Sequence, residues 1–216
     1  MYLYALPSTI LGLAFDIDKT LYDHDEYANH QVEILIQRLA WERDEDPAVT
    51  RLAIEQWRSS YAEAHGGVRQ SLGNTFAALG IPLATSVLWR EQLIDPGAFL
   101  EKDTRLTDAL IRLSGQYRLA AVTNNPVAVG RATLEALGVH HHFSVVVGLD
   151  TTMQSKPNPA PYARASELLA LEPSSMVSIG DRYDIDIAPA LMLGMGGILV
   201  SGVRDVYTLP ERLERR

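Results

Sequence analysis

The chain has 216 residues, 47% of them hydrophobic and 21% charged, a composition typical of a globular protein with a sizeable core. Its formal net charge of -8 disfavours binding to a nucleic acid polymer, and no stretch reaches the roughly 20 apolar residues that a membrane span requires. The chain contains no cysteine, which excludes disulfides and thiolate chemistry, and its N-terminus lacks the pattern of a secretory signal. We therefore expect a cytoplasmic enzyme, monomeric or homodimeric, that binds neither membranes nor nucleic acid.

The first predicted strand is the apolar run that starts at Leu11 and ends at two carboxylates, Asp16 and Asp18. An apolar run bounded by turn-prone polar residues is typical of a strand buried on both faces, and parallel sheets bind ligands at the carboxyl ends of such strands. Because two nearby carboxylates repel each other, the pair predicts either a bound cation or acid-base chemistry.

A helical insertion is predicted to follow the first strand. Apolar residues recur there at spacings of three and four: Val32, Leu35, Ile36 and Leu39. We expect the three tryptophans of this segment, Trp41, Trp57 and Trp89, to belong to its core. The sequence thus predicts a small all-helical cap domain over residues 21–98, positioned over the aspartates, and a core formed by residues 1–20 and 99–216.

From about residue 101 the pattern alternates between helices and strands. Strands are predicted at 117–122, 143–147, 175–179 and 197–200. Helices are predicted around Leu106, Leu110 and Leu113, and at 127–137, 159–170 and 186–193, with a loop at the three histidines 140–142. This alternation predicts an α/β fold with a doubly wound parallel sheet.

Three further polar clusters follow predicted strands, so a parallel sheet would bring them to the edge that carries Asp16. Thr123 and Asn124 precede a helix N-terminus, which favours an anion. Lys156 stands before a proline and offers a cation, and Asp181 adds a carboxylate suited to magnesium. Taken singly, these residues are equally typical of a helix cap, a surface lysine and an acidic helix start.

In chain order the polar clusters are Asp16-x-Asp18-x-Thr20, Thr123, Lys156-Pro157, and Gly180-Asp181 with the later Asp186. They resemble the four signature motifs of the haloacid dehalogenase-like (HAD) hydrolase superfamily, and the resemblance runs through nearly the whole chain. It implies a doubly wound core with a helical cap inserted after the first motif, which agrees with the segment pattern.

By this resemblance Asp16 would be the nucleophile that attacks phosphorus, and Asp18 would be the general acid and then the general base. Thr123 and the backbone of Asn124 would bind the transferring phosphoryl group, and Lys156 would neutralise it and restrain Asp16. The implied carboxylates of a magnesium (Mg2+) site are Asp16, Asp18, Asp181 and Asp186, with Asp186 acting through Lys156 or a metal-bound water, and with Asp184 as the weaker alternative to Asp186. Lys19 departs from the family pattern, which more often has Gly or Asn there; it could alter the turn, reach a substrate or be a solvated surface residue.

The resemblance leaves the reaction open because dehalogenases, phosphonatases, mutases and phosphatases share this architecture. Asp18 and Asp181 disfavour a dehalogenase, and the absence of lysine between Asp25 and Leu93 disfavours a phosphonatase. Mutase relatives often have an acid where this chain has Gly180. We therefore expect hydrolysis of a small phosphorylated metabolite, with a phosphomutase, a sugar-phosphate phosphatase or a catalytically inactive metabolite-binding protein as alternatives.

Two segments resemble the pyrimidine 5'-nucleotidase branch of the superfamily. The first runs from Phe15 to Tyr22, and the second contains Tyr61, His65 and Arg69 at helical spacing. By this resemblance the last three residues would contact the base, sugar or a further anion of a nucleoside 5'-monophosphate. Ordinary packing within the cap explains them equally well.

Overall fold

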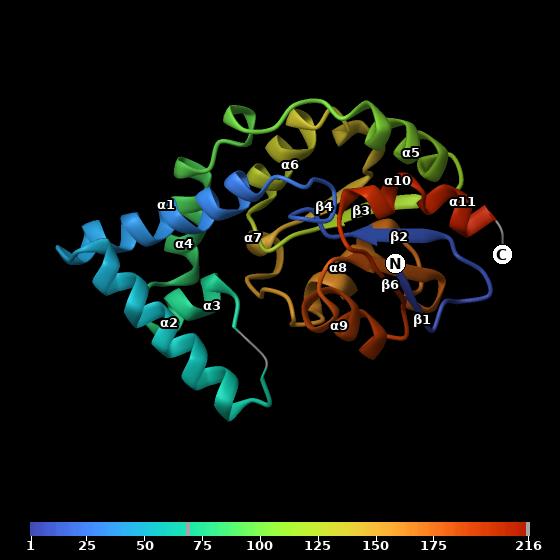
Figure 1. Ribbon diagram of the computed structural model, residues 1–216. Helices are drawn as coiled ribbons and strands as arrows, with labels where there is room; N and C mark the ends of the chain where they lie inside the picture. The colour runs from blue at the N-terminus through green and yellow to red at the C-terminus, as the bar shows by residue number, and fades with distance from the viewer. Residues whose placement is uncertain (68–69, 215–216) are drawn as a thin grey trace. The chain divides into compact units, whose positions relative to one another are not determined.

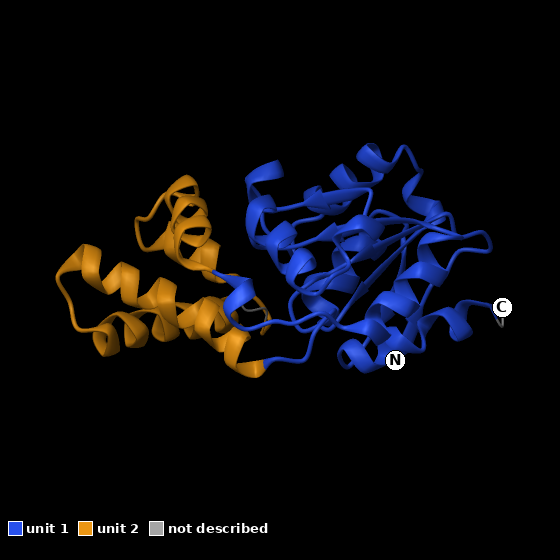
Figure 2. Ribbon diagram, turned by 90° about the horizontal axis from the view of Figure 1, so that it is seen from above, with its two compact units in different colours: residues 1–24, 95–216 blue, residues 25–94 orange. Residues whose placement is uncertain are grey.

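The computed structural model of the chain describes residues 1–67 and 70–214 (Figure 1). The chain divides into two compact units, the first formed by Met1–His24 with Asp95–Arg216 and the second by Asp25–Ile94 (Figure 2). The chain passes from one unit to the other after residues 24 and 94, whereas the sequence places these boundaries after residues 20 and 98.

The first unit is built on one six-stranded sheet with the order β1-β6-β5-β2-β3-β4. Its strands are β1 (Tyr2–Tyr4), β2 (Gly12–Phe15), β3 (Arg118–Val122), β4 (Val145–Val147), β5 (Met176–Gly180) and β6 (Gly196–Leu199). Strands β2 to β6 are parallel, and β5 and β3 flank β2, with Leu13 beside both Val177 and Leu119. The sequence did not predict β1, which pairs with β6 in the antiparallel direction at one edge of the sheet.

Helices cover both faces of this sheet, which confirms the doubly wound α/β fold. They are α5 (Thr104–Ser114), α6 (Val127–Ala136), α7 (Leu149–Thr152), α8 (Ala160–Leu169), α9 (Ala188–Met192), α10 (Val203–Tyr207) and α11 (Leu209–Glu214). In Figure 1, α5, α10 and α11 lie on one side of the sheet, and α8 and α9 lie on the other. Helix α5 begins where it does because the Asp103 side chain accepts a hydrogen bond from the backbone N–H of Leu106.

The apolar core lies between the sheet and these helices. Leu13, Ala14 and Phe15 are fully buried, as expected for a strand covered on both faces. Two local details differ from the expectation. The helix predicted at 186–193 is present as α9 and is preceded by a π-helical turn, Tyr183–Ile187. The histidines 140–142 form a 3-10 turn instead of an irregular loop, and the next strand begins at Val145.

The second unit is entirely helical in its described residues. It consists of α1 (Asp25–Arg43), α2 (Pro47–Ala64), α3 (Leu72–Ala78) and α4 (Leu83–Leu93). Asp46 caps α2 by accepting a hydrogen bond from the N–H of Ala48, and Pro47 suits the first helical turn. The core of this unit consists of Leu35, Ile36, Leu39, Ile54, Phe76 and Trp89. No helix in the described part of the chain is long and apolar enough to cross a membrane.

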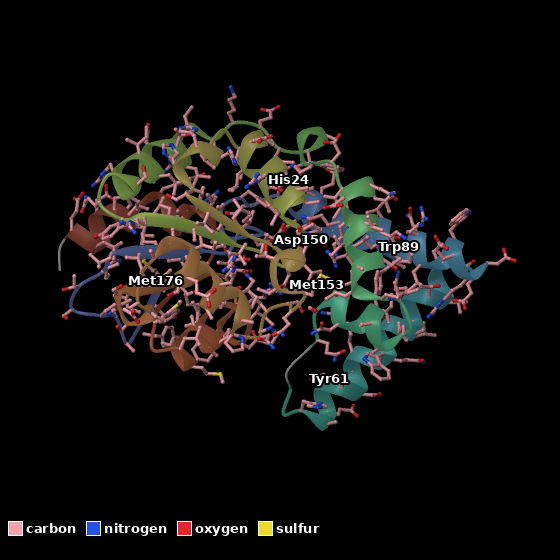
Figure 3. The ribbon with its side chains drawn as sticks, turned by 180° about the vertical axis from the view of Figure 1, so that it is seen from behind. His24, Tyr61, Trp89, Asp150, Met153 and Met176 are labelled. Carbon is pink, nitrogen blue, oxygen red and sulfur yellow. The ribbon has the colours of Figure 1, made fainter. Side chains whose placement is uncertain are left out.

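The tryptophans of the helical unit do not all belong to its core. Trp89 on α4, labelled in Figure 3, is buried, whereas Trp41 is 72% exposed and Trp57 is 41% exposed. Trp41 lies on an outward face of α1, where the guanidinium of Arg38 packs over its ring at 4.9 Å. The Trp57 indole N–H donates to the side chain of Gln70. The expectation of three core tryptophans was therefore wrong for two of them.

Candidate active site

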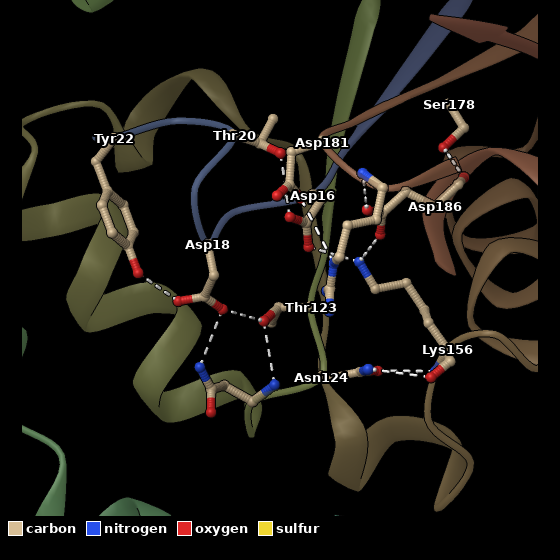
Figure 4. Close-up of polar contacts among 12 residues, drawn as sticks. Asp16, Asp18, Thr20, Tyr22, Thr123, Asn124, Lys156, Ser178, Asp181 and Asp186 are labelled. Carbon is tan, nitrogen blue, oxygen red and sulfur yellow. Dashed lines mark hydrogen bonds and ion pairs between the residues drawn. The ribbon is translucent and has the colours of Figure 1, made fainter. Parts of the chain in front are cut away.

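Asp16 stands directly after β2, the strand that lies between β3 and β5 in the sheet. It is 2% exposed, and its backbone N–H donates to the carbonyl oxygen of Ile179 on β5 at 2.8 Å. One of its carboxylate oxygens, Oδ2, accepts a hydrogen bond from Thr20 Oγ1 at 3.1 Å. The parallel pairing thus places Asp16 where the loops after β3 and β5 also converge (Figure 4).

Lys156 is the buried cation of this site. Its side chain has no exposed surface, and Nζ donates to Asp16 Oδ1 at 2.5 Å and to Asp186 Oδ1 at 2.7 Å. Burial alone would lower the pKa of Lys156, but the two carboxylates outweigh that effect and raise this pKa above its usual range. Lys156 therefore stays charged between two acids.

The side chain of Asn124 holds the backbone of Lys156 in place. Its Nδ2 donates to the carbonyl oxygen of Lys156 at 3.1 Å, and its Oδ1 accepts the N–H of Lys156 at 2.7 Å. These two hydrogen bonds join the loop after β3 to the loop that carries Lys156. Sequence reasoning gave Asn124 a role through its backbone and did not foresee this use of its amide.

Three carboxylates gather beside Lys156: oxygens of Asp16, Asp181 and Asp186 lie within 4.8 Å of one another. The Oδ1 atom of Asp181 is buried and accepts no hydrogen bond from the described residues. Burial and then the charge of Asp16 raise the pKa of Asp181 to about 7. A buried oxygen that accepts no hydrogen bond, placed among clustered carboxylates, fits a hard divalent cation, so these residues suit Mg2+.

Asp186, rather than the exposed Asp184, is the acid that reaches this cluster. The π-helical turn brings it back over Gly180, where an added Cβ would lie 2.4 Å from the Cβ of Asp186. Its Oδ2 accepts the backbone N–H of Arg182 at 3.2 Å, and its carbonyl oxygen accepts the Ser178 hydroxyl at 2.7 Å. Burial raises the pKa of Asp186, and the ammonium of Lys156 partly offsets that rise.

The side chain of Asp18 is not part of the three-carboxylate cluster, although the sequence placed it among the metal ligands. Its Oδ1 accepts the Tyr22 hydroxyl at 2.6 Å. Its Oδ2 accepts Asn125 Nδ2 at 3.1 Å and Thr123 Oγ1 at 3.4 Å. Asp18 is thus held by hydroxyl and amide groups from two loops (Figure 4), an arrangement that suits proton transfer more than metal binding.

The remaining expected residues are Tyr61 and His65 of the helical unit, Arg69, and Lys19 in the loop after β2. Tyr61 and His65, at the end of α2, stack on each other with ring centroids 3.8 Å apart and planes at 8°; Figure 3 labels Tyr61 there. Arg69 lies outside the described residues. Lys19 is exposed and has a φ of 62°, a left-handed conformation that glycine and asparagine adopt at less cost.

Comparison with known proteins identifies the family. The family model described as haloacid dehalogenase-like hydrolase matches residues 10–194. The chain therefore belongs to the haloacid dehalogenase-like hydrolases. It is 28% identical over 197 residues to the phosphoglycolate phosphatase of Salmonella choleraesuis (strain SC-B67), an alignment that covers 84% of this chain and 78% of that protein.

Solved structures of the family share the fold. The HAD phosphatase from Thermococcus onnurineus superposes with a TM-score of 0.65 at 21% identity and covers 94% of this chain and 98% of its own. A 2-haloacid dehalogenase from Pseudomonas syringae pv. Tomato DC3000 gives a TM-score of 0.59 at 19% identity, with 96% and 99% coverage. Since a phosphatase and a dehalogenase both match, the fold does not choose between these reactions. The curated relatives are phosphatases, and the expected enzyme class, a phosphatase of this family, is confirmed.

Sequence reasoning missed four residues that contact the site: Tyr22, Asn125, Ser178 and Arg182. Tyr22 ends the segment from Phe15 that resembles the nucleotidase branch, and Asn125 directly follows Asn124, but nothing in the sequence showed which neighbour their side chains would bind. Arg182 is half-exposed, with Nε 3.7 Å from Asp181 Oδ1. The signal that could have identified Arg182 is its position in the sequence, directly after Asp181.

Proposed function

We propose that this protein is a Mg2+-dependent phosphomonoester hydrolase that acts on a small phosphorylated metabolite through an aspartyl-phosphate intermediate. The observation that carries the proposal is the ion pair between Lys156 and Asp16, with the carboxylates of Asp181 and Asp186 gathered beside it. A buried nucleophilic carboxylate next to a fixed cation suits attack on a phosphoryl group, whose charge must be balanced as it transfers.

In the first step, a carboxylate oxygen of Asp16 forms a bond to phosphorus while the bond from phosphorus to the ester oxygen breaks. The leaving oxygen takes a proton from Asp18, which becomes a carboxylate. In the second step, Asp18 accepts a proton from water as that water attacks phosphorus and the bond to Asp16 breaks. Phosphate leaves, and both aspartates return to their starting states.

The other residues of the site orient and neutralise the phosphoryl group. Thr123 presents its hydroxyl after β3, and Lys156 supplies positive charge next to Asp16. Asp16, Asp181 and Asp186 would hold the cation, with Asp186 also in contact with Lys156. When bound, Mg2+ screens the repulsion between the Asp16 carboxylate and the phosphoryl oxygens.

The position of Gly180 favours hydrolysis over a mutase reaction. Mutase relatives often carry an acidic residue there, whereas in this chain even a Cβ would overlap Asp186. The related phosphoglycolate phosphatases support a small ester as substrate. We propose that the helical unit selects the leaving group, and we retain a nucleoside 5'-monophosphate as a candidate substrate on the sequence resemblance of Tyr61, His65 and Arg69.

The test is phosphate release from a panel that includes phosphoglycolate, sugar phosphates, UMP, CMP and p-nitrophenyl phosphate, with Mg2+ or with excess chelator. We expect Mg2+-dependent release that Asp16→Asn abolishes. The matched control is Asp184→Asn, which removes an exposed acid near the site and should retain activity. Release that survives Asp16→Asn, or no release from any ester, would overturn the proposal. A preference for UMP or CMP would support the nucleotidase branch.

A further inference from the structure

We propose that Tyr22 is a positioning residue for Asp18, and that its hydroxyl fixes the orientation in which Asp18 meets the leaving group. The inference rests on the proposed hydrolase function. It concerns a residue that is absent from the four motifs and that lies four positions after Asp18, in the loop beyond β2.

The geometry of the contact is specific. The Tyr22 hydroxyl donates to Asp18 Oδ1 at 2.6 Å, a distance within the usual range for a hydrogen bond between two oxygens. Tyr22 is only 3% exposed, so its ring is held by the surrounding core and its hydroxyl has little freedom to move. A buried tyrosine needs a partner for its hydroxyl, and here that partner includes the proposed acid-base residue.

Asp18 is held from two sides by residues of different loops. Tyr22 binds Oδ1 from the loop after β2, and Asn125 binds Oδ2 at 3.1 Å from the loop after β3. Asn125 is itself 5% exposed, and its backbone N–H donates to Thr123 Oγ1 at 3.1 Å. Rotation of the Asp18 carboxyl group would break its hydrogen bond to Tyr22 or its hydrogen bond to Asn125, so these two bonds together fix the plane of the carboxyl group. Catalysis gains from such fixed groups because a misplaced proton donor lowers the rate steeply.

A positioning role of Tyr22 predicts a result that a purely structural role of its ring does not. Protonation of the leaving oxygen matters greatly for an alkyl phosphate and little for p-nitrophenyl phosphate, whose phenolate is a good leaving group. A poorly oriented Asp18 should therefore slow alkyl esters selectively. A general loosening of the core should slow both classes of ester alike.

The experiment compares native protein with Tyr22→Phe, which keeps the buried ring and removes only the hydroxyl. The native protein's best alkyl phosphate and p-nitrophenyl phosphate are measured at saturating Mg2+. We compare kcat/KM, which reports the first step alone, because the second step, in which Asp18 activates water, is common to both esters. We expect kcat/KM to fall about tenfold for the alkyl ester and less than about threefold for p-nitrophenyl phosphate. The matched control is Tyr207→Phe, which removes another tyrosine hydroxyl that donates to an aspartate, Asp103. It should leave the ratio of the two rates unaltered.

A double-mutant cycle shows whether Tyr22 acts through Asp18. In an Asp18→Asn background, measured with p-nitrophenyl phosphate and the alkyl ester, Tyr22→Phe should have no further effect on either rate. Equal losses on both esters, or a full additional loss in the Asp18→Asn background, would overturn the inference while leaving the hydrolase function intact. An inactive native protein would overturn both.

Discussion

Replacing Lys156 by methionine tests the electrostatics of the site most directly. Methionine preserves most of the side-chain volume but leaves Asp16 and Asp186 buried without the ammonium that lies 2.5 and 2.7 Å from them. Removing one partner of a buried ion pair typically costs about 3–5 kcal/mol, because the remaining charge is left uncompensated. We expect a loss of that size in the free energy of unfolding of the core at pH 8 in chelator.

The assay is urea unfolding followed by far-UV circular dichroism, with the slope against urea checked for constancy. All three tryptophans lie within residues 25–94, so tryptophan fluorescence reports the helical unit and serves as an internal reference. Lys102→Met is the matched control: Lys102 is exposed, and its replacement should change stability by no more than about 0.5 kcal/mol. A loss below about 1 kcal/mol for Lys156→Met would refute the reasoning.

Three further predictions concern other residues. Gly180→Ala should cost about 1–3 kcal/mol and lower activity, because the new methyl group must displace Asp186. Trp89→Ala should cost about 3–5 kcal/mol, whereas Trp41→Ala at a 72% exposed position should cost less than about 1 kcal/mol. The pKa of Asp181 is raised to about 7 from 3.8, so in chelator its contribution to stability is fully present below about pH 4 and is lost as pH rises through 7. Asp181→Asn should therefore be more stable than native protein at pH 8, on the order of 2–4 kcal/mol, and nearly equal to it at pH 4.

Each of these predictions has its own control and contrary outcome. Gly97→Ala, where the nearest atom to a new Cβ is Asp95 Oδ1 at 3.4 Å, should be nearly neutral; equal losses at both glycines would contradict the overlap argument. For the tryptophans, the measurement is thermal unfolding of the helical unit, and similar losses would contradict the assigned burial. For Asp181, urea unfolding at several pH values decides, and a difference from native protein that does not change with pH would contradict the raised pKa.

The parts of the site that follow strands could be predicted from the sequence. Asp16 ends a buried apolar run, and Lys156 and Asp181 follow in an order that a parallel sheet brings to one edge. These positions can be predicted because each belongs to a polar cluster that follows an apolar run typical of a buried strand. The family assignment rests on the same motifs and is confirmed by the matched model over residues 10–194.

The details that the sequence could not provide depend on contacts rather than on patterns. Strand β1 has three residues, too few for a periodicity, and only its pairing with β6 defines it. Trp41 looks like a core residue by type, yet its place on an outward face of α1 leaves it exposed. The hydrogen bond from Tyr22 to Asp18 lies in a loop, where no helical or strand period relates the two side chains.

The long sequence separation of the central ion pair has a consequence for synthesis of the protein. Asp16 and Lys156 are 140 positions apart, and β2 finds its neighbour β5 only after residue 180 has been made. Residues 25–94 are continuous in the sequence, so the helical unit can form early on the ribosome, whereas β2 can pair with β5 only near the end of synthesis. The proposed nucleophile, Asp16, thus acquires its buried cation late, and a nascent chain carries no assembled site until most of its length has emerged.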